Sequence, residues 1–496
     1  MVRRFFRDSA VYVLPAALSS GVSFFLFTLY AHRFTPQQYG DLDLLLLTGT
    51  LIGFTVALEV YQAVGRYVTG ESDERLRTGY ASTGLFITVA MYSLFTMVFE
   101  LLATPITHVL LGSHTSPGLL RVATAWMCVQ GLLNFTQSQL RWQMRPRAFA
   151  TASAVNGFGT AGSAALFVFG LHLEVRGALL GQLTGSSLAL LYVAVATRKT
   201  FAFQFSLDKC RLLLLYSIPL VPSGVGVFLN LYADRLVIKH LRSVADVGIY
   251  GVAYRVATIV LLLLVGFQGA ATPLILAGKD DPATPGDIAR IMRVFWAMAL
   301  SSFVALSLLA TPMLRILAAG PYQSASNVVP FLVIASLFSG MYFFAPGLAI
   351  AKKTVTMAKL TAFSGVANLL LAIVLVPPLG IVGAGIATAA TSLLWFVLLM
   401  RQSQRYYRVP HRWPPLVTAF TVVVVFVGIA LALLPSTRVG ALDPGILAIR
   451  MLLVGLGVIL SVGLSLDMRD LGSSPRQLAA LVKGPGQRCA AARQDR

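Results

Sequence analysis

Long apolar runs, separated by short polar or basic segments, follow one another along almost the whole chain. A helix needs about 20 mostly apolar residues to cross the hydrocarbon core of a bilayer. The pattern therefore predicts an all-α polytopic membrane protein with about 14 transmembrane helices. No stretch between the runs is long and polar enough to form a separate soluble domain.

The same short motifs occur in both halves of the chain, roughly 200 residues apart. The pairs are Tyr12-x-x-Pro15 with Tyr216-x-x-Pro219, the run Leu29 to Arg33 with Leu231 to Arg235, Tyr39-Gly40 with Tyr250-Gly251, and Leu101 to Pro105 with Leu308 to Pro312. Several matches within one narrow band of separation indicate an internal duplication. The last pair is expected at the outer ends of the third and ninth spans.

An even number of predicted spans separates equivalent points, so both copies enter the membrane in the same orientation. The predicted architecture is two parallel-repeat six-helix bundles, residues 1–200 and 205–403. Two additional transmembrane helices follow within residues 415–466. The basic cytoplasmic tail, residues 467–496, lacks apolar periodicity and is predicted to be disordered. Substrate sites in such repeats lie between the two halves.

The chain has few charged residues, and most of them are Lys or Arg. Only 12% of residues are charged, against about 25% in soluble domains. The net charge is +20, and most of the 39 Lys and Arg residues fall in alternate segments between the spans. This bias predicts a multi-pass protein of the cell (inner or plasma) membrane with both termini in the cytoplasm. It also explains the charge without nucleic acid, and we expect the tail to contact anionic membrane lipids.

Several motif matches carry no chemistry. Cys128, Cys210 and Cys489 have neither disulfide nor metal spacing. The glycines of Gly157-x-Gly159-x-x-Gly162 and of Gly181-x-x-x-Gly185 lie inside spans, which favours close helix packing over nucleotide binding. No metal and no cofactor is expected. No outer loop is large enough to hold catalytic acids, so no catalytic residue is predicted and the chain is not expected to be an enzyme.

An ionisable residue inside a span marks a pathway or a partner by default, and Arg255 is the clearest case. Three roles remain open for it. Its side chain can extend to the headgroups. It can pair with Asp43 or Asp234 as an outer gate. It can bind an anionic group of a substrate, because a guanidinium donates two parallel hydrogen bonds to a phosphate.

The remaining charged candidates lie near span ends. Arg33 and Arg235 are expected to anchor at the outer interface, with a role in a central cavity as the alternative. Arg66 can meet phosphate at a cytoplasmic entrance, and Glu59 can partner it. We predict Asp41, Asp43, Asp234 and Glu59 as gate residues or as carriers of a coupling proton or sodium ion. These positions stand out because charge is costly inside a bilayer.

The sequence resembles the oligosaccharidyl-lipid flippases, or polysaccharide biosynthesis transporters, of the multidrug/oligosaccharidyl-lipid/polysaccharide exporter superfamily. The resemblance rests on Tyr216-x-x-Pro219, Asp234-Arg235, the run from Val247 to Arg255, and Tyr39-Gly40 in the first half. It implies two six-helix bundles, alternating access and a cationic cavity. Arg33, Arg66 and Arg255 would line that cavity, with Arg235 as a fourth candidate. Pro15 and Pro219 occupy matching positions in the two copies and are predicted hinges.

The resemblance implies movement of a lipid-linked (polyprenyl-diphosphate) oligosaccharide or polysaccharide precursor from the inner to the outer leaflet. A glycan polymerase and glycosyltransferases would be its partners. A cation-coupled multidrug-type exporter of the same superfamily is the alternative, and it would favour acids over arginines in the cavity. A flippase for the peptidoglycan precursor also remains open. A membrane glycan polymerase or ligase is less favoured, because it needs a large outer loop.

Overall fold

The computed structural model describes residues 21–466, except 23, 113–114, 319 and 435–442, and except 262–280, where only 264, 268 and 275 are described. The regular structure of this part is entirely helical, as predicted. Within the described residues, ten helices are long and apolar enough to cross a membrane, or up to twelve if each of two bent helix pairs is one span. The fold is consistent with a polytopic membrane protein of about fourteen transmembrane helices.

The chain divides into two compact units, residues 1–251 and 252–496. The predicted boundary between two bundles at residues 200–205 stays a prediction. The helices that lie in the first unit, including the start of α11, are α2 (Pro36–Thr55), α3 (Val60–Val68), α4 (Glu74–Leu101), α5 (Ala103–Leu111), α6 (Pro117–Trp142), α7 (Pro146–Ala165), α8 (Glu174–Ala196), α9 (Leu207–Ser217), α10 (Val221–Leu241) and α11 (Val244–Ala257).

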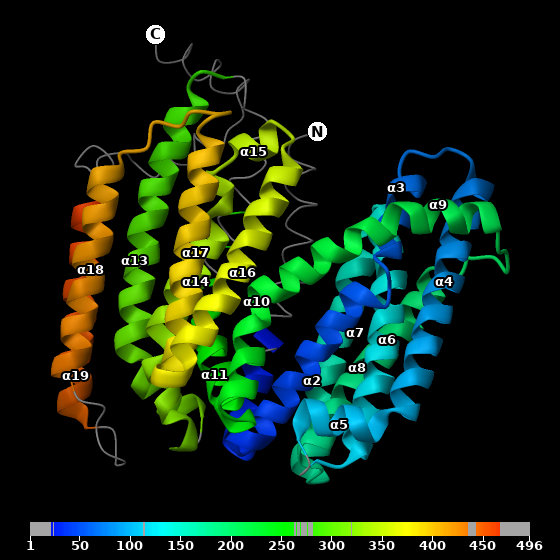
Figure 1. Cartoon of the computed structure of the whole chain (residues 1–496), viewed down its shortest axis with the longest axis horizontal. Helices are drawn as coiled ribbons and strands as arrows, with labels where there is room; N and C mark the ends of the chain where they lie inside the picture. The colour runs from blue at the N-terminus through cyan, green and yellow to red at the C-terminus, as the bar shows by residue number, and fades with distance from the viewer. Residues whose placement is uncertain are drawn as a thin grey trace. The chain divides into compact units, whose positions relative to one another are not determined.

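In the first unit, α4, α6, α7 and α8 run alongside one another, and α9 crosses one end of this group (Figure 1). Small residues allow a close approach between α7 and α8. A side chain at Gly181 would overlap Ala164, and one at Gly185 would overlap Thr160. The prediction that the Gly181-x-x-x-Gly185 motif serves helix packing is therefore confirmed.

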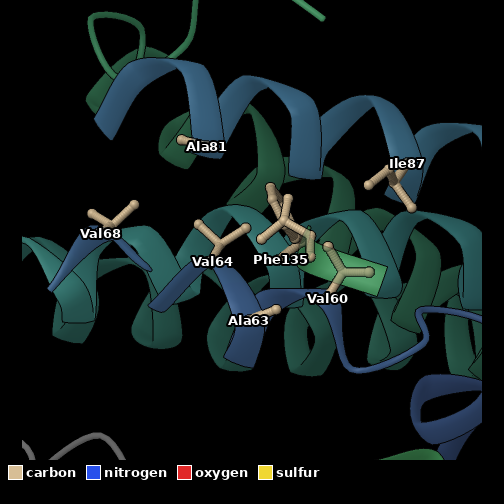
Figure 2. Packing of buried hydrophobic residues seen from close by; sticks show 8 residues of the cluster. Val60, Ala63, Val64, Val68, Ala81, Ile87 and Phe135 are labelled. Carbon is tan, nitrogen blue, oxygen red and sulfur yellow. The ribbon is translucent and has the colours of Figure 1, made fainter. Parts of the chain in front are cut away.

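A short helix, α3, is buried against α4, α6 and α9. Figure 2 shows Val60 and Val64 of α3 beside Phe135 of α6, with Ala81 and Ile87 of α4 facing α3. The apolar stripe at spacing i, i+4, i+8 explains why this short helix docks with one face inward. The packing holds α3 at an angle to α2.

Helices α2 and α3 meet at an angle of 44°, and residues 56–59 between them form a turn. Leu58 and Glu59 have φ values of 48° and 53°, in the left-handed region that non-glycine residues avoid. Such strain costs about 1–3 kcal/mol per residue and persists only where surrounding structure enforces it. The bend also places Glu59 at the start of α3.

Pro219 lies in a single 3₁₀ turn, η2 (Ile218–Leu220), between α9 and α10. Proline lacks an N–H and clashes with the carbonyl of residue i−4, which explains the local change of helix type. The other predicted hinge, Pro15, lies outside the described residues.

The second unit is built from α13 (Thr284–Leu317), η3 (Gly320–Asn327), α14 (Val329–Gly340), η4 (Met341–Phe344), α15 (Gly347–Ile350), α16 (Thr354–Leu379), α17 (Ile381–Ser403), α18 (Trp413–Leu433) and α19 (Pro444–Ser465). The rings of Trp296, Phe338 and Phe420 join α13, α14 and α18. The long helix α13 continues to Leu317, so the predicted end of the ninth span at Pro312 is wrong by about one turn.

Candidate functional site

Helices α2 and α10 are joined by a buried ion pair. Arg235 Nε lies 2.9 Å from Asp43 Oδ2. Asp43 is 5% exposed and Arg235 is 2% exposed. The Tyr232 and Tyr250 rings lie 5.4 and 5.7 Å from the guanidinium carbon. A charge buried in a membrane protein needs such partners, because its desolvation costs several kcal/mol.

The same cluster extends to α11 through Asp234, which is 1% exposed. Asp234 Oδ1 accepts the backbone N–H of Arg235 at 2.8 Å. Asp234 Oδ2 accepts the hydroxyl of Tyr250, which is fully buried. Asp41, another predicted carboxylate, is also buried in α2. Three of the predicted acids therefore lie where α2 meets α10 and the first half of α11.

Glycines set the distance between α2 and α11. A side chain at Gly40 would overlap the Val244 carbonyl, and one at Gly248 would overlap the Pro36 carbonyl. A Cβ on Gly251 would lie 3.1 Å from Asp43 Oδ2. The repeated Tyr-Gly motifs of the two halves thus pack against each other, which requires glycine for close backbone approach. We call this contact the Gly40–Gly248 crossing.

A separate cavity of about 530 Å³ lies inside the first unit, between α2, α3, α4, α6, α7 and α8. Glu59, at the bend between α2 and α3, lines it and is 2% exposed. Glu59 Oε2 accepts a hydrogen bond from Gln62 Nε2 at 2.6 Å. A Cβ on Gly224 of α10 would lie 3.2 Å from the other carboxylate oxygen. The bend thus aims a carboxylate at both the cavity and α10.

Several polar side chains of this cavity come from one face of α6. Gln130 Nε2 donates to Asn134 Oδ1 at 2.9 Å, and Ser186 Oγ of α8 donates to Gln130 Oε1 at 2.7 Å. Gln137 Nε2 donates to Ser153 Oγ of α7 at 2.9 Å. Arg141 lies at the same cavity. Sequence reasoning missed this stripe, although its i, i+4, i+7 spacing within an apolar run was the available signal.

The predicted cations do not gather in the 530 Å³ cavity, whose lining contains Arg141 and none of the four. Arg33 is exposed and contacts His172 Nδ1 at 3.2 Å. The Arg66 guanidinium stacks 4.8 Å from the centre of the Tyr216 ring. Arg255 is half-buried on α11.

Two predicted pairings change. Glu59 bonds to Gln62 and Arg66 lies on Tyr216, so the pairing of Glu59 with Arg66 is wrong. The proposed ion pair of Asp43 is made by Arg235 rather than Arg255. The nearly complete burial of Arg235 also leaves it no access to headgroups, unlike the expected anchor. The sequence could not distinguish these arginines, because helix rotation decides which side chain faces α2.

Among the described residues, no group of three His, Cys, Asp or Glu side chains is placed to hold a metal ion. The charged residues at the Gly40–Gly248 crossing and in the 530 Å³ cavity are suited to binding a substrate, moving a proton or controlling conformation.

Residues 5–278 match the model of a family described as polysaccharide biosynthesis protein. The lipid II flippase MurJ, in an inward closed conformation, has a similar structure with a TM-score of 0.71 at 15% identity; the match covers 93% of this chain and 99% of that chain. An inward-facing multidrug resistance MATE family transporter of the MOP superfamily gives 0.63 at 15% identity, covering 80% and 94%. A MATE transporter of Vibrio cholerae gives 0.55 at 16% identity, covering 82% and 98%. No match was found among curated proteins.

Proposed function

Because the chain belongs to the polysaccharide biosynthesis protein family, we propose that it is a flippase for a lipid-linked oligosaccharide or polysaccharide precursor. The substrate, carried on polyprenyl diphosphate, moves from the inner to the outer leaflet by alternating access. The family match over residues 5–278 carries this proposal. The fold shared with MurJ and MATE transporters is compatible with it.

Physical chemistry supports a role for the arginines outside the buried pair. A translocated diphosphate needs cations that can reach it, and guanidinium groups suit phosphate oxygens. Arg255, Arg33 and Arg66 are the proposed diphosphate contacts. Arg235 joins them only when its pairing with Asp43 is broken.

The Gly40–Gly248 crossing is the proposed gate. Asp43 with Arg235, and Asp234 with Tyr250, hold α2 against α10 and α11. Charged pairs suit a gate because they specify one closed register, and their separation requires both partners to be rehydrated or paired elsewhere. Asp41 belongs to the same proposed gate, and Pro15 and Pro219 remain the proposed hinges.

Glu59 is the proposed coupling group, taking a proton or a sodium ion. Its carboxylate faces a polar cavity inside one unit and lies close to Gly224 of α10. A change in its charge would alter contacts at the bend and at α10 together. Backbone strain at Leu58 and Glu59 supports this, because strained segments are suited to switching between two arrangements.

Both termini are proposed to lie on the cytoplasmic side of the inner or plasma membrane, as the distribution of basic residues favours. A glycan polymerase and glycosyltransferases are the proposed partners. Reporter fusions at the two termini that are active only in the cytoplasm test the orientation. An expressed fusion whose reporter is inactive contradicts it.

Leaflet sidedness of the lipid-linked glycan tests the function. A strain lacking the gene is complemented with wild type, Arg255→Ala or Arg147→Ala, and outer-leaflet glycan is labelled with an impermeant reagent. Arg147 is an exposed residue that does not line the 530 Å³ cavity, so it is the matched control. We expect inner-leaflet accumulation without the gene, and relief by wild type and Arg147→Ala but not by Arg255→Ala. If wild type and both variants relieve the accumulation equally, the flippase function stands and Arg255 does not contact the substrate.

A cation-coupled exporter is the second candidate, favoured by one observation. The 530 Å³ cavity holds a buried carboxylate among aromatic and amide side chains, which suits a cation. If the deletion leaves glycan sidedness unchanged and raises sensitivity to cationic drugs, the exporter replaces the flippase. If lipid II is the only glycan lipid affected, the substrate is the peptidoglycan precursor.

A further inference from the structure

A second cavity, of about 660 Å³, lies at the end of the first unit where α3 ends and α4 begins. It shares no lining residue with the cavity that contains Glu59. Its walls come from the end of α3, the first turns of α4, the turn between α6 and α7, the end of α8 and the segment after α8. We call it the basic cavity.

Cations dominate its lining. Arg77, Arg145, Arg198 and Lys199 face one carboxylate, Glu74. Within the described part of the chain, no cation of the cavity forms an ion pair with Glu74 or another acid. Concentrated positive charge without a partner is unfavourable unless an anion neutralises it. The lining therefore favours an anionic ligand.

Hydrogen bonds fix the walls of the basic cavity, and most of its cations are not needed for them. Arg145 Nη1 donates to the Ala196 carbonyl at 2.8 Å, which ties the α6–α7 turn to α8. Gln143 Nε2 donates to Thr200 Oγ1 at 2.7 Å. Because the walls are fixed before a ligand arrives, little ordering cost opposes binding.

The linker that follows indicates where the cavity lies relative to the bilayer. The Ala202 N–H donates to Ser82 Oγ at 2.9 Å, so the linker is bound to α4. The next residues expose large apolar side chains, with Phe203 96% exposed and Phe205 55% exposed. Both rings pack edge-on against Phe86, further along α4. Exposed phenylalanines of this kind are stable in hydrocarbon, while the neighbouring cations are stable at the headgroup level.

We propose that the basic cavity binds the phosphate-bearing headgroup of an anionic glycerophospholipid. Arg198 and Lys199 lie at the entrance to the linker and contact the phosphate with Arg77, while the acyl chains run beside Phe203 and Phe205. With the orientation proposed above, this is the inner leaflet, which is rich in anionic lipid. Retaining a phospholipid here is independent of the transported substrate.

The experiment compares purified full-length protein in nanodiscs of phosphatidylcholine with nanodiscs that also contain phosphatidylglycerol. Native mass spectrometry counts retained phosphatidylglycerol, and the apparent melting temperature reports its stabilising effect. The variant Arg198→Gln/Lys199→Gln removes two cations from the cavity. The variant Arg75→Gln/Arg147→Gln removes two exposed cations at the same end of the unit but outside the cavity, and is the matched control.

We expect wild type and the control to retain phosphatidylglycerol. The Arg198→Gln/Lys199→Gln variant should bind it with an affinity at least about tenfold lower. The charge-preserving Arg198→Lys should retain most of the binding, which distinguishes lost charge from lost folding. Equal retention by the two double variants overturns the proposal. Stabilisation by inorganic phosphate that depends on Arg198 and Lys199, without retention of phosphatidylglycerol, also overturns the lipid as ligand and leaves a site for soluble phosphate.

Discussion

Arg235 Nε lies 2.9 Å from Asp43 Oδ2, and both side chains are almost completely buried. Removing one partner of a buried pair leaves an uncompensated charge and costs about 3–5 kcal/mol. We therefore expect Asp43→Asn or Arg235→Gln to lower the stability of the purified protein strongly, measured by thermal unfolding in detergent.

The double variant Asp43→Asn/Arg235→Gln measures the interaction energy between the two side chains. It should lose much less stability than the sum of the single variants, because no lone charge remains. The exposed pair between Arg121 and Glu100 is the control, with side chains 61% and 42% exposed. Glu100→Gln should cost at most about 1 kcal/mol. Additive losses for Asp43 and Arg235 would show that the pair is not coupled.

The Gly40–Gly248 crossing gives a second prediction. A methyl group at Gly248 overlaps the Pro36 carbonyl, so Gly248→Ala should separate α2 from α11 and lower stability by about 1–3 kcal/mol. Gly226 of α10 has open space around its Cβ position and is the matched control. Gly226→Ala should be neutral or stabilise by up to about 1 kcal/mol, because alanine favours helix. Similar melting temperatures for the two variants would contradict the close crossing.

Glu59 gives a third prediction, on transport. Glu59→Gln preserves the size of the side chain and a hydrogen-bonding oxygen for Gln62, but it removes the charge. We expect the variant to fold and to lose coupling of substrate transport to an imposed proton or sodium gradient in proteoliposomes. Glu100→Gln should transport normally. Gradient-dependent transport by Glu59→Gln at the wild-type rate would exclude Glu59 as the coupling group.

Much of the fold followed from periodicity, because the bilayer leaves few choices for a long apolar run. The helical class and the family were predicted correctly, and the fold is consistent with the predicted number of about fourteen spans. The site was predicted only in part. The duplication pointed to Tyr39-Gly40 and Tyr250-Gly251 as equivalent motifs, but not to their packing against each other. Side-chain pairing depends on how each helix is rotated, and the sequence does not define rotation where most faces are apolar.

The folded protein changes the pKa of His411, although the sequence around this residue gives no sign of it. It lies outside the spans, between α17 and α18, and its ring packs near Trp413. Burial, together with the nearby charge of Arg293, lowers the pKa of His411 to about 4. The unfolded chain binds a proton below about pH 6.5, whereas the folded protein does so only below about pH 4. Stability is therefore fully present above pH 6.5 and falls as the pH decreases through this window.

We expect this loss to reach roughly 2–3 kcal/mol near pH 4, and His411→Asn to remove it. Melting temperatures of wild type and variant should differ in their pH dependence between about pH 4 and 6.5. His108 is exposed and is the control, so His108→Asn should retain the wild-type profile. Parallel profiles for wild type and His411→Asn would refute the prediction.

The repeated motif Leu-Leu-Ala-Thr-Pro takes two different structures, and Arg450 supplies the physical reason. In the first copy α4 ends at Leu101, before Pro105, whereas α13 continues through Pro312. Proline has no N–H, so the carbonyl of Leu308, four residues earlier, loses its helical donor. Arg450 of α19 is 3% exposed and donates Nη1 to that carbonyl at 2.6 Å. The additional C-terminal helix thus stabilises a helix that the proline would otherwise interrupt.

Replacing Arg450 by Met should leave the Leu308 carbonyl without a donor and lower stability by about 1–3 kcal/mol. Pro312→Ala restores a backbone N–H, so the double variant Pro312→Ala/Arg450→Met should lose clearly less stability than Arg450→Met alone. The coupling is measured by a double-mutant cycle of unfolding in detergent. If Pro312→Ala does not reduce the effect of Arg450→Met, Arg450 stabilises the unit through packing alone. A positive coupling instead identifies replacement of the missing proline N–H as the role of Arg450, and it explains why the same five residues end a helix in one half and continue it in the other.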